Sequence, residues 1–274
     1  MSKPVYKTFL VKNPCHAMLD GITGHPELGV PEFELAAKQH EDYVDAIKSL
    51  NVNVIELAKD ERYPDSCFVE DPVVIIPNEL AIITNPGASS RNGEKLEMIK
   101  TIKALKEEGY FKDIKYIEEY SPEAFMDGGD VLPIDDTYYI GLSARTNAKA
   151  IEAFESYVKP LGKTVVPIPV TEFLHLKTGT TYIENNYLLV TGEFCKTPEF
   201  QKFNLIEVPK EEDYAVNVIY CNGNIIMPAG YPTVKAKLEE IMAKHPDQYL
   251  SIVEVDTSEY KKIDGGLTCL SVRF

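Results

Sequence analysis

Apolar runs and amphipathic stretches alternate along the chain in an order that recurs five times. The spacing of the apolar positions predicts a helix, a lone strand, a polar loop and a β-hairpin in each repeat. The clearest hairpin signal is Asn222-Gly223 between two apolar runs, because Asn-Gly favours the tight turns that join paired strands. Helices are predicted at residues 31–50, 94–108, 147–161 and 233–244, with a weaker helical segment after Phe194.

The predicted strands complete the repeat. Lone strands follow the helices at residues 51–57, 114–117, 164–170, 204–208 and 250–255. The last strand, 270–274, has one candidate partner left, residues 8–12 near the other end of the chain. We therefore expect an α/β fold in which five similar hairpin-helix-strand (ββαβ) modules form a ring, as one domain over residues 1–274. A generic α/β sheet is the alternative, since alternating strands and helices fit it too.

The loop after each lone strand is where the pattern predicts chemistry. In a ring of modules these loops occupy equivalent places and converge on the axis. A thiol, an imidazole and several carboxylates meeting there would form a catalytic site. Taken singly, each residue also fits an ordinary role, such as a buried thiol, a packed histidine or an Asp-Gly turn. The loop residues concerned are Asp65, Glu70, Asp71, Asp127, Asp130, His175 and Cys269.

Two arginines share a position in their modules. Arg91 and Arg145 each follow a hairpin and come just before a predicted helix. A cation is unfavourable at a helix N-terminus, so each arginine is a candidate for holding a carboxylate. A solvated surface arginine is the alternative.

Composition narrows the classes of protein. The net charge of −15 argues against nucleic acid and fits either a cationic ligand or simple solubility. The five cysteines are an odd number with no CxxC pair, which indicates reduced thiols in the cytoplasm and no zinc site. No apolar run reaches 18 residues, so no membrane span is expected, and residues 1–5 lack the apolar stretch of a signal peptide.

Four ordered motifs resemble those of the dimethylarginine dimethylaminohydrolases, a family of guanidino-group-modifying enzymes. The similarity extends from about residue 8 to residue 274 and implies a five-bladed α/β propeller. The motifs are Pro64-Asp65-Ser66-Cys67-Phe68-Val69-Glu70-Asp71-Pro72, Asp127-Gly128-Gly129-Asp130-Val131, Leu174-His175-Leu176-Lys177-Thr178 and Asp264-Gly265-Gly266-Leu267-Thr268-Cys269.

The resemblance implies a role for each matched residue. Cys269 would be the nucleophile, His175 the general acid and base, and Asp127 the acid that orients the guanidinium. Some relatives have Glu at the position of Asp127. Residues 19–31 resemble a mobile lid. The implied substrate-binding residues are Asp71 and Glu70 for the guanidinium, Arg91 and Arg145 for the α-carboxylate, and Asp65 with the carbonyls of Ile22 and Ile263 for the α-amino group.

The implied activity is hydrolysis of N-methylated arginine to citrulline and an amine through a covalent thiouronium intermediate. It requires no metal and no organic cofactor, and its partner is a small guanidino molecule, methylated arginine or arginine. A homodimer is compatible with the resemblance. The alternatives that stay open are a compact arginine deiminase, an amidinotransferase and a non-catalytic binder of arginine-like ligands.

Overall fold

The computed structural model describes residues 6–274. Residues 1–5, on which the expectation of no signal peptide depends, lie outside the described residues. The chain divides into two compact units. Unit 1 comprises Met1–Cys67 and Thr178–Arg273, and unit 2 comprises Phe68–Lys177 and Phe274. The single catalytic domain expected from the sequence stays a prediction.

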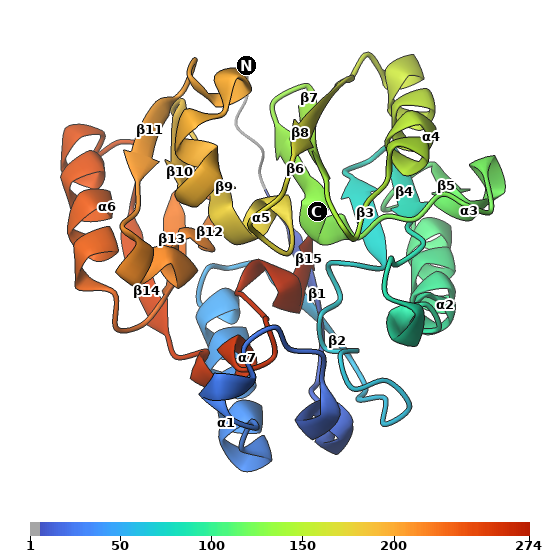
Figure 1. The fold of residues 1–274 in the computed structure, drawn as a ribbon, viewed down its shortest axis with the longest axis horizontal. Helices are drawn as coiled ribbons and strands as arrows, with labels where there is room; N and C mark the ends of the chain where they lie inside the picture. Colours follow the sequence, from blue (N-terminus) through green and yellow to red (C-terminus); the bar gives the residue numbers. More distant parts are fainter. Residues whose placement is uncertain (1–5) are drawn as a thin grey trace. The chain divides into compact units, whose positions relative to one another are not determined.

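The described chain contains five three-stranded sheets (Figure 1). In every sheet the middle strand is antiparallel to its hairpin partner and parallel to the strand that follows. Unit 1 has β15 (Ser271–Arg273), β1 (Thr8–Lys12) and β2 (Asn53–Leu57), then β9 (Thr180–Tyr182), β10 (Tyr187–Val190) and β11 (Asn204–Glu207), then β12 (Ile219–Cys221), β13 (Asn224–Pro228) and β14 (Ser251–Val255). Unit 2 has β3 (Val73–Ile76), β4 (Leu80–Ile83) and β5 (Asp113–Tyr116), then β6 (Val131–Ile134), β7 (Thr137–Leu142) and β8 (Thr164–Pro169).

A helix joins the parallel strands in four of the five modules. The fourth module has only the 3-10 turns η6 (Gly192–Lys196) and η7 (Pro198–Phe200) where a weaker helix was expected. Pro198 stands at the start of the second turn, and proline cannot continue a helix that precedes it. The four helices are α1 (Phe33–Lys48), α2 (Glu94–Glu107), α4 (Ala148–Val158) and α6 (Pro232–Lys244).

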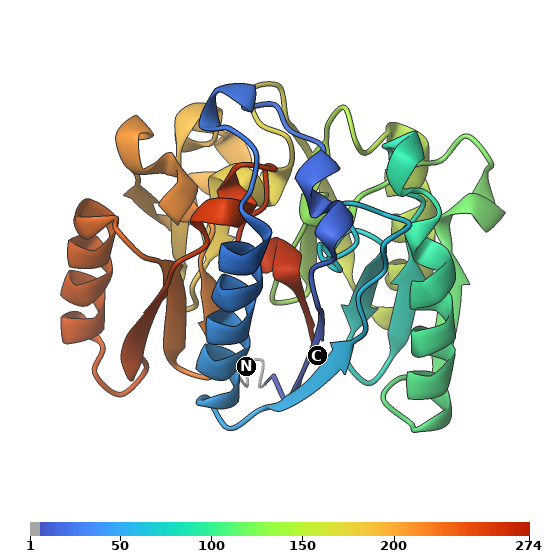
Figure 2. The same cartoon turned by 90° about the horizontal axis from the view of Figure 1, so that it is seen from below.

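The two ends of the chain complete one sheet, as the sequence predicts. β15 pairs antiparallel with β1, and Leu10 lies opposite Val272. Figure 2 shows the dark red β15 beside the dark blue β1. This pairing fixes the strand that begins two residues after Cys269, because three buried residues of β1, Phe9–Val11, pair with it.

Local sequence explains the hairpins. Asn222 and Gly223 both have positive φ, at 50° and 91°, which is the conformation that a two-residue hairpin turn requires. The strands on either side belong to the core of unit 1, with Ile225 and Leu238 fully buried. The core of unit 2 consists of other buried residues, among them Ile82, Ile140 and Phe154.

The predicted loops contain more structure than expected. Three of them include one-turn helices, and Cys269 lies in the 3-10 turn η9 (Thr268–Leu270) just before the last strand. Cys195, in η6, is only half-buried. The one-turn helices are α3 (Ile117–Tyr120), α5 (Leu176–Gly179) and α7 (Ser258–Lys261).

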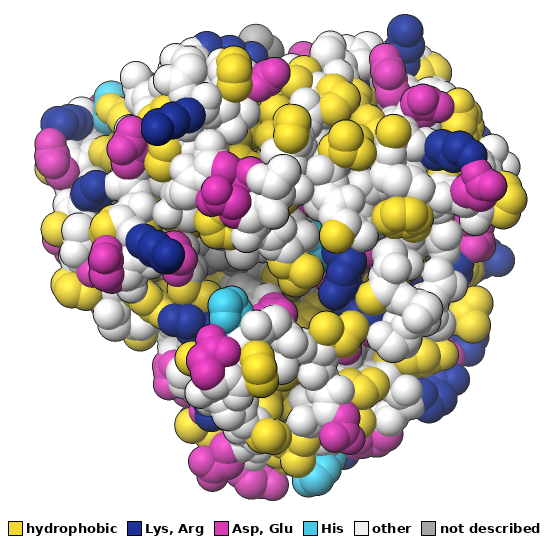
Figure 3. Space-filling view, in the orientation of Figure 1, with side chains coloured by type: hydrophobic (Ala, Val, Ile, Leu, Met, Phe, Trp, Pro, Cys, Tyr) yellow, Lys and Arg dark blue, Asp and Glu magenta, His cyan; other side chains and the backbone are white. Residues whose placement is uncertain are grey.

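Charged side chains of both signs lie on the surface. On the face drawn in Figure 3, Lys and Arg side chains are scattered among Asp and Glu. Within residues 6–274, none of the helices combines the length and apolar character needed to cross a bilayer.

Candidate active site

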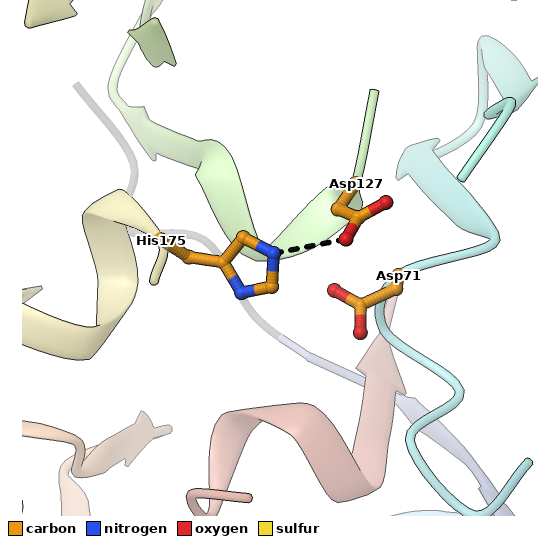
Figure 4. A group of neighbouring side chains, drawn as sticks. All are labelled: Asp71, Asp127 and His175. Atoms are coloured by element: carbon orange, nitrogen blue, oxygen red, sulfur yellow. Dashed lines mark hydrogen bonds and ion pairs between the residues drawn. The ribbon is translucent and has the colours of Figure 1, made fainter. Parts of the chain in front are cut away.

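Unit 2 gathers a histidine and two carboxylates that the sequence assigns to three different loops. Atoms of Asp71, Asp127 and His175 that could act as ligands lie within 4.8 Å of one another, and all three residues are buried (Figure 4). Asp71 precedes β3, Asp127 precedes β6, and His175 precedes α5. The prediction that these loops converge is thus confirmed for the part of the site that unit 2 carries.

His175 and Asp127 form a hydrogen-bonded pair. The imidazole Nε2 lies 3.0 Å from Asp127 Oδ2, while Nδ1 has no hydrogen-bond partner among the described residues. Burial alone lowers the pKa of His175, but the hydrogen bond to Asp127 and the charges of Asp71 and Asp130 outweigh it and raise the pKa to about 9. At neutral pH the pair is therefore an imidazolium and a carboxylate.

Asp127 is held by several donors. Its Oδ1 accepts the Gly87 N–H at 2.9 Å, and Arg145 Nη1 lies 3.4 Å from Oδ2. Burial raises the pKa of Asp127, yet the hydrogen bond to His175 and the charges of His175 and Arg91 hold it below its ordinary value. The side chain of Arg145 keeps 15% of its surface exposed. Arg145 therefore combines a carboxylate contact with access to solvent.

Arg91 has a different environment from Arg145. Its guanidinium is buried and donates to Asp71 Oδ2 through Nη1 and to Glu94 through Nε and Nη2. Nη2 also donates to the Phe68 carbonyl at 3.1 Å. Arg91 does hold carboxylates, as its position predicts, but they belong to the protein. Its role on a substrate carboxylate stays a prediction.

Glu70 and Asp71 differ in how they are engaged. Lys177 Nζ lies 2.6 Å from Glu70 Oε1, and both side chains are buried. Asp71 accepts from Arg91 and from the Gly129 N–H at 3.0 Å. A carboxylate offers about four acceptor sites, so Asp71 retains capacity for further donors.

The glycine pair of Asp127-Gly128-Gly129 lets the backbone approach the cluster closely. A Cβ on Gly129 would lie 2.6 Å from His175 Nδ1 and 3.0 Å from Asp71 Oδ1, and a Cβ on Gly128 would overlap the Glu70 carbonyl. Side chains at either position would push the acid and the histidine apart.

The cluster is poorly suited to a metal, although its three donor atoms lie close enough. A histidine ligates through a neutral nitrogen, whereas His175 holds its proton at neutral pH. Arg91 already occupies Asp71 and adds positive charge. The proton on His175 and the Arg91–Asp71 pair therefore leave the cluster without the free donors that a metal ion needs.

Unit 1 carries the candidate nucleophile on a braced turn. Cys269 is half-buried, and its Sγ accepts the Gly266 N–H at 3.5 Å. Asn217 makes two hydrogen bonds to Thr268 in this turn. Its Oδ1 accepts the Thr268 N–H at 2.9 Å, and its Nδ2 donates to Thr268 Oγ1 at 3.1 Å. A Cβ on Gly266 would lie 2.5 Å from Asn217 Oδ1, which explains the glycine.

Two tyrosines complete the brace on the Cys269 turn. Tyr214 donates to the Gly265 carbonyl at 2.8 Å, and Tyr43 lies 3.1 Å from the Leu267 carbonyl and 2.8 Å from Ser271 Oγ. The sequence analysis missed Asn217, Tyr214 and Tyr43. No local motif marks them, because each is far from Cys269 along the chain. Tyr43 lies on the buried face of α1, where an aromatic residue is expected in any case.

The residues expected at a substrate amino group also lie in unit 1. Asp65 Oδ1 accepts the Ile22 N–H at 3.1 Å. A Cβ on Gly21 would lie 3.0 Å from the Ile263 side chain and 3.2 Å from Asp65 Oδ1. Asp65, Ile22 and Ile263 are therefore neighbours. The segment expected to form a lid is tied at Gly24, whose N–H donates to Asp264 Oδ2 at 2.6 Å.

These features define a class before any comparison with known proteins. The chain is an α/β protein of five ββαβ modules with a cysteine, a histidine and an aspartate as its candidate catalytic residues. It belongs to the N,N-dimethylarginine dimethylhydrolase family, whose eukaryotic family model matches residues 31–270. It is 40% identical to the N(G),N(G)-dimethylarginine dimethylaminohydrolase of Pseudomonas aeruginosa over 98% of this chain and 100% of that protein.

Solved structures confirm the fold class. The Pseudomonas aeruginosa enzyme, as a cysteine-to-serine variant complexed with citrulline, matches 99% of this chain and 100% of that chain with a TM-score of 0.91 at 39% identity. A histidine-to-glycine variant of a dimethylarginine dimethylaminohydrolase, as an adduct with S-methyl-L-thiocitrulline, matches 98% and 100% with a TM-score of 0.90 at 40% identity. An α/β fold of five pseudo-symmetric ββαβ modules, predicted from the sequence pattern, is therefore correct.

Proposed function

We propose that this protein hydrolyses the guanidinium group of N-methylated arginine to citrulline and methylamine or dimethylamine. Family membership and the citrulline complex of a 39% identical structure support the substrate class. The observation that carries the proposal is the His175–Asp127 pair at 3.0 Å with Asp71 in the same buried cluster. Such a cluster provides both an acid and an acceptor of guanidinium N–H groups.

The first step is nucleophilic attack. We propose that the Cys269 thiolate attacks the central guanidinium carbon and that the Gly266 N–H supports the charge on sulfur. The leaving amine takes a proton from His175, which is an imidazolium at neutral pH. We assign that proton to Nδ1, because Asp127 occupies Nε2. The product of this step is an S-alkylthiouronium on Cys269 and a free amine.

The second step is hydrolysis. His175, now neutral, takes a proton from water as the water oxygen bonds to the thiouronium carbon. The carbon–sulfur bond then breaks and the thiolate leaves, while the second proton of the water passes from the oxygen through solvent to the released amine, so that the carbon becomes the ureido carbonyl of citrulline. His175 ends the cycle protonated. Every proton and bond is accounted for by substrate, water and these two side chains, so the scheme uses neither a metal nor an organic cofactor.

Substrate orientation follows from the remaining groups. We propose that Asp71 accepts guanidinium N–H groups, with Glu70 adding negative charge beside its partner Lys177. Asp65 and the carbonyls of Ile22 and Ile263 would accept the α-ammonium. Arg145 is the arginine best suited to the α-carboxylate, because Arg91 would first have to release a protein carboxylate.

Location and assembly belong to the same proposal. A cytoplasmic location is supported by the five cysteines, all within residues 6–274, none of which forms a disulfide. The assembly stays open between a monomer and a homodimer, and sedimentation velocity decides between them.

A panel of substrates tests the function. Asymmetric dimethylarginine, monomethylarginine, arginine and agmatine would be assayed for ureido product and released amine under one condition. We expect kcat/KM to be highest for methylated arginine and lowest for agmatine, which lacks the α-carboxylate. Packing of one methyl group is worth about 0.8 kcal/mol, roughly fourfold, so any larger preference must come from unpaired polar groups.

The other outcomes of the panel identify the alternatives. A higher kcat/KM for arginine than for dimethylarginine would make the protein an arginine deiminase. Product that forms only with an added acceptor amine would indicate an amidinotransferase. Saturable binding without any ureido product would leave a binding protein.

A further inference from the structure

Asp130 is a fully buried carboxylate that the proposed reaction does not use. It lies three residues after Asp127 and is surrounded by donors. Its Oδ1 accepts the Leu176 N–H at 2.9 Å. Its Oδ2 accepts the hydroxyls of Ser143 at 2.7 Å and Thr146 at 2.6 Å.

The contacts of Asp130 are those of an ionised carboxylate, although burial raises the pKa of Asp130 above its ordinary value. The Ser143 hydroxyl already accepts the Arg145 N–H at 2.9 Å, and the Thr146 hydroxyl accepts the Asp127 N–H at 3.2 Å. Each hydroxyl therefore directs its own proton at Asp130. Two O–H donors and one N–H donor point at the Asp130 carboxyl. These contacts satisfy a carboxylate anion, and none of them requires the carboxyl to donate a proton.

Asp130 is connected to both members of the acid pair. Through Leu176 it holds the backbone directly after His175, and through Thr146 it holds the backbone of Asp127. The fit is tight, because a Cβ on Gly141 would overlap Asp130 Oδ1. Asp130 thus connects the segment that carries Asp127 with the segment that carries His175, and these two segments belong to different modules.

We propose that Asp130 is a positioning residue and buried counter-ion that keeps His175 protonated for its role as general acid. The inference rests on the proposed function for the use of that proton, although the electrostatic effect itself needs no substrate. Asp130 touches neither the reacting atoms nor the imidazole. It acts through the Leu176 amide, through Thr146 and through its charge, which adds to the rise in the pKa of His175. The other charged groups around His175 are Asp71, Asp127, Arg91, Arg145 and the Glu70–Lys177 pair.

Titration of His175 tests the proposal without substrate. Histidine would be labelled with ¹³C at Cε1 in the full-length protein, and His175→Gln would assign the signal among the five histidines. Asp130→Asn keeps the shape and the acceptor for the Leu176 N–H but removes the charge. We expect the His175 midpoint to fall by about one pH unit. The alkaline limb of the kcat/KM profile should move by the same amount.

A matched control removes a different charge of the same module. Asp136 lies in the exposed turn between β6 and β7 and pairs with Lys163 at 2.5 Å. Asp136→Asn should leave the His175 midpoint within a few tenths of a pH unit, because exposed charges are screened. An Asp130→Asn midpoint equal to that of the wild type would overturn the proposal.

If Asp130→Asn fails to fold, the titration midpoint of His175 in the wild type still tests the proposal. A wild-type midpoint near 6.5 would show that the surrounding carboxylates do not hold the proton, and would overturn the proposal without any variant. If the protein fails to act on methylated arginine, the midpoints still decide the role of Asp130, so the two failures are distinguishable.

Discussion

Each compact unit contains one nearly fully buried histidine, and the two have opposite protonation. His175 in unit 2 is 4% exposed and His40 in unit 1 is 2% exposed. Burial lowers the pKa of His40 to about 4, against the opposing effects of the Glu56 charge and of a hydrogen bond to the Lys12 backbone. The same burial acts on His175, but the carboxylates around it raise the pKa to about 9. Charged partners, and not burial, make His175 a candidate acid.

The turn that carries the candidate nucleophile is held mainly by neutral groups. Asn217, Tyr214 and Tyr43 contact it through amide, hydroxyl and carbonyl groups, and one cation, Arg273, donates to the Thr268 carbonyl at 3.4 Å. Unit 2 instead holds its candidate residues with ion pairs. A neutral brace positions an atom without changing the charge around it, whereas a cluster of buried charges sets protonation as well. The difference between the two units suits a cysteine whose thiolate is to be stabilised by the charge of a bound cation.

The largest effect is expected at the nucleophile. Cys269→Ser should lower turnover of methylated arginine by several orders of magnitude, because a hydroxyl cannot form the thiouronium intermediate. The Tm should change little, since the serine keeps the size of the side chain and its neutral brace. Steady-state kinetics and a melting curve provide the two measurements.

Cys195 offers a matched control for that variant. It is also half-buried, and it lies in the 3-10 turn η6 of the same unit. Cys195→Ser should retain wild-type turnover. Wild-type turnover in Cys269→Ser, or its loss in Cys195→Ser, would refute the assignment of the nucleophile.

A smaller but still large effect is expected in the charged cluster. Arg91→Ala leaves Asp71 and Glu94 buried without their cation, which typically costs about 3–5 kcal/mol of unfolding free energy. Urea denaturation followed by circular dichroism measures it. Arg62→Ala is the control, because Arg62 is 62% exposed and its pair with Asp60 is worth at most about 1 kcal/mol. Equal losses of unfolding free energy in the two variants would show that the buried ion pairs of Arg91 stabilise the protein no more than an exposed pair does.

Much of this could be predicted from the sequence, for physical reasons that particular residues illustrate. The hairpin at Asn222-Gly223 depends on local backbone preference. The pairing of β15 with β1 could be predicted because the repeat left only one strand without a partner. His175 stood out only through its place in the repeat, since a single histidine between apolar residues is more often a packed core residue.

The rest depends on contacts between residues far apart in the chain. The Asn217 amide meets Thr268 across 51 positions, and the contact becomes visible only after folding. Arg91 was expected to hold a carboxylate, but local sequence could not show that Asp71, 20 positions earlier, supplies it. Protonation was equally unpredictable, because it depends on the sum of charges that several loops bring together.

The smallest effect is a difference in how stability depends on pH. His40 has its folded pKa at about 4, below the unfolded value near 6.5. Its contribution is therefore fully present above pH 6.5 and is lost as the pH falls from 6.5 to 4, by about 3 kcal/mol at most. His175 has its folded pKa at about 9, so its contribution is present below pH 6.5 and is lost as the pH rises toward 9. The two windows do not overlap.

Replacing His40 separates the two contributions. His40→Leu removes a buried Nε2 that has no hydrogen-bond partner among the described residues, together with one hydrogen bond to the Lys12 backbone, so we expect a small loss of stability and a folded variant. Between pH 6.5 and 4 its unfolding free energy should fall less than that of the wild type, whereas between pH 6.5 and 9 the two curves should run parallel. His25→Ala, at an exposed histidine, is the control and should follow the wild type throughout. Urea denaturation at half-unit steps of pH gives the curves. If His40→Leu loses as much stability as the wild type on the acid side, then His40 is not held neutral, and burial alone would not explain the contrast with His175.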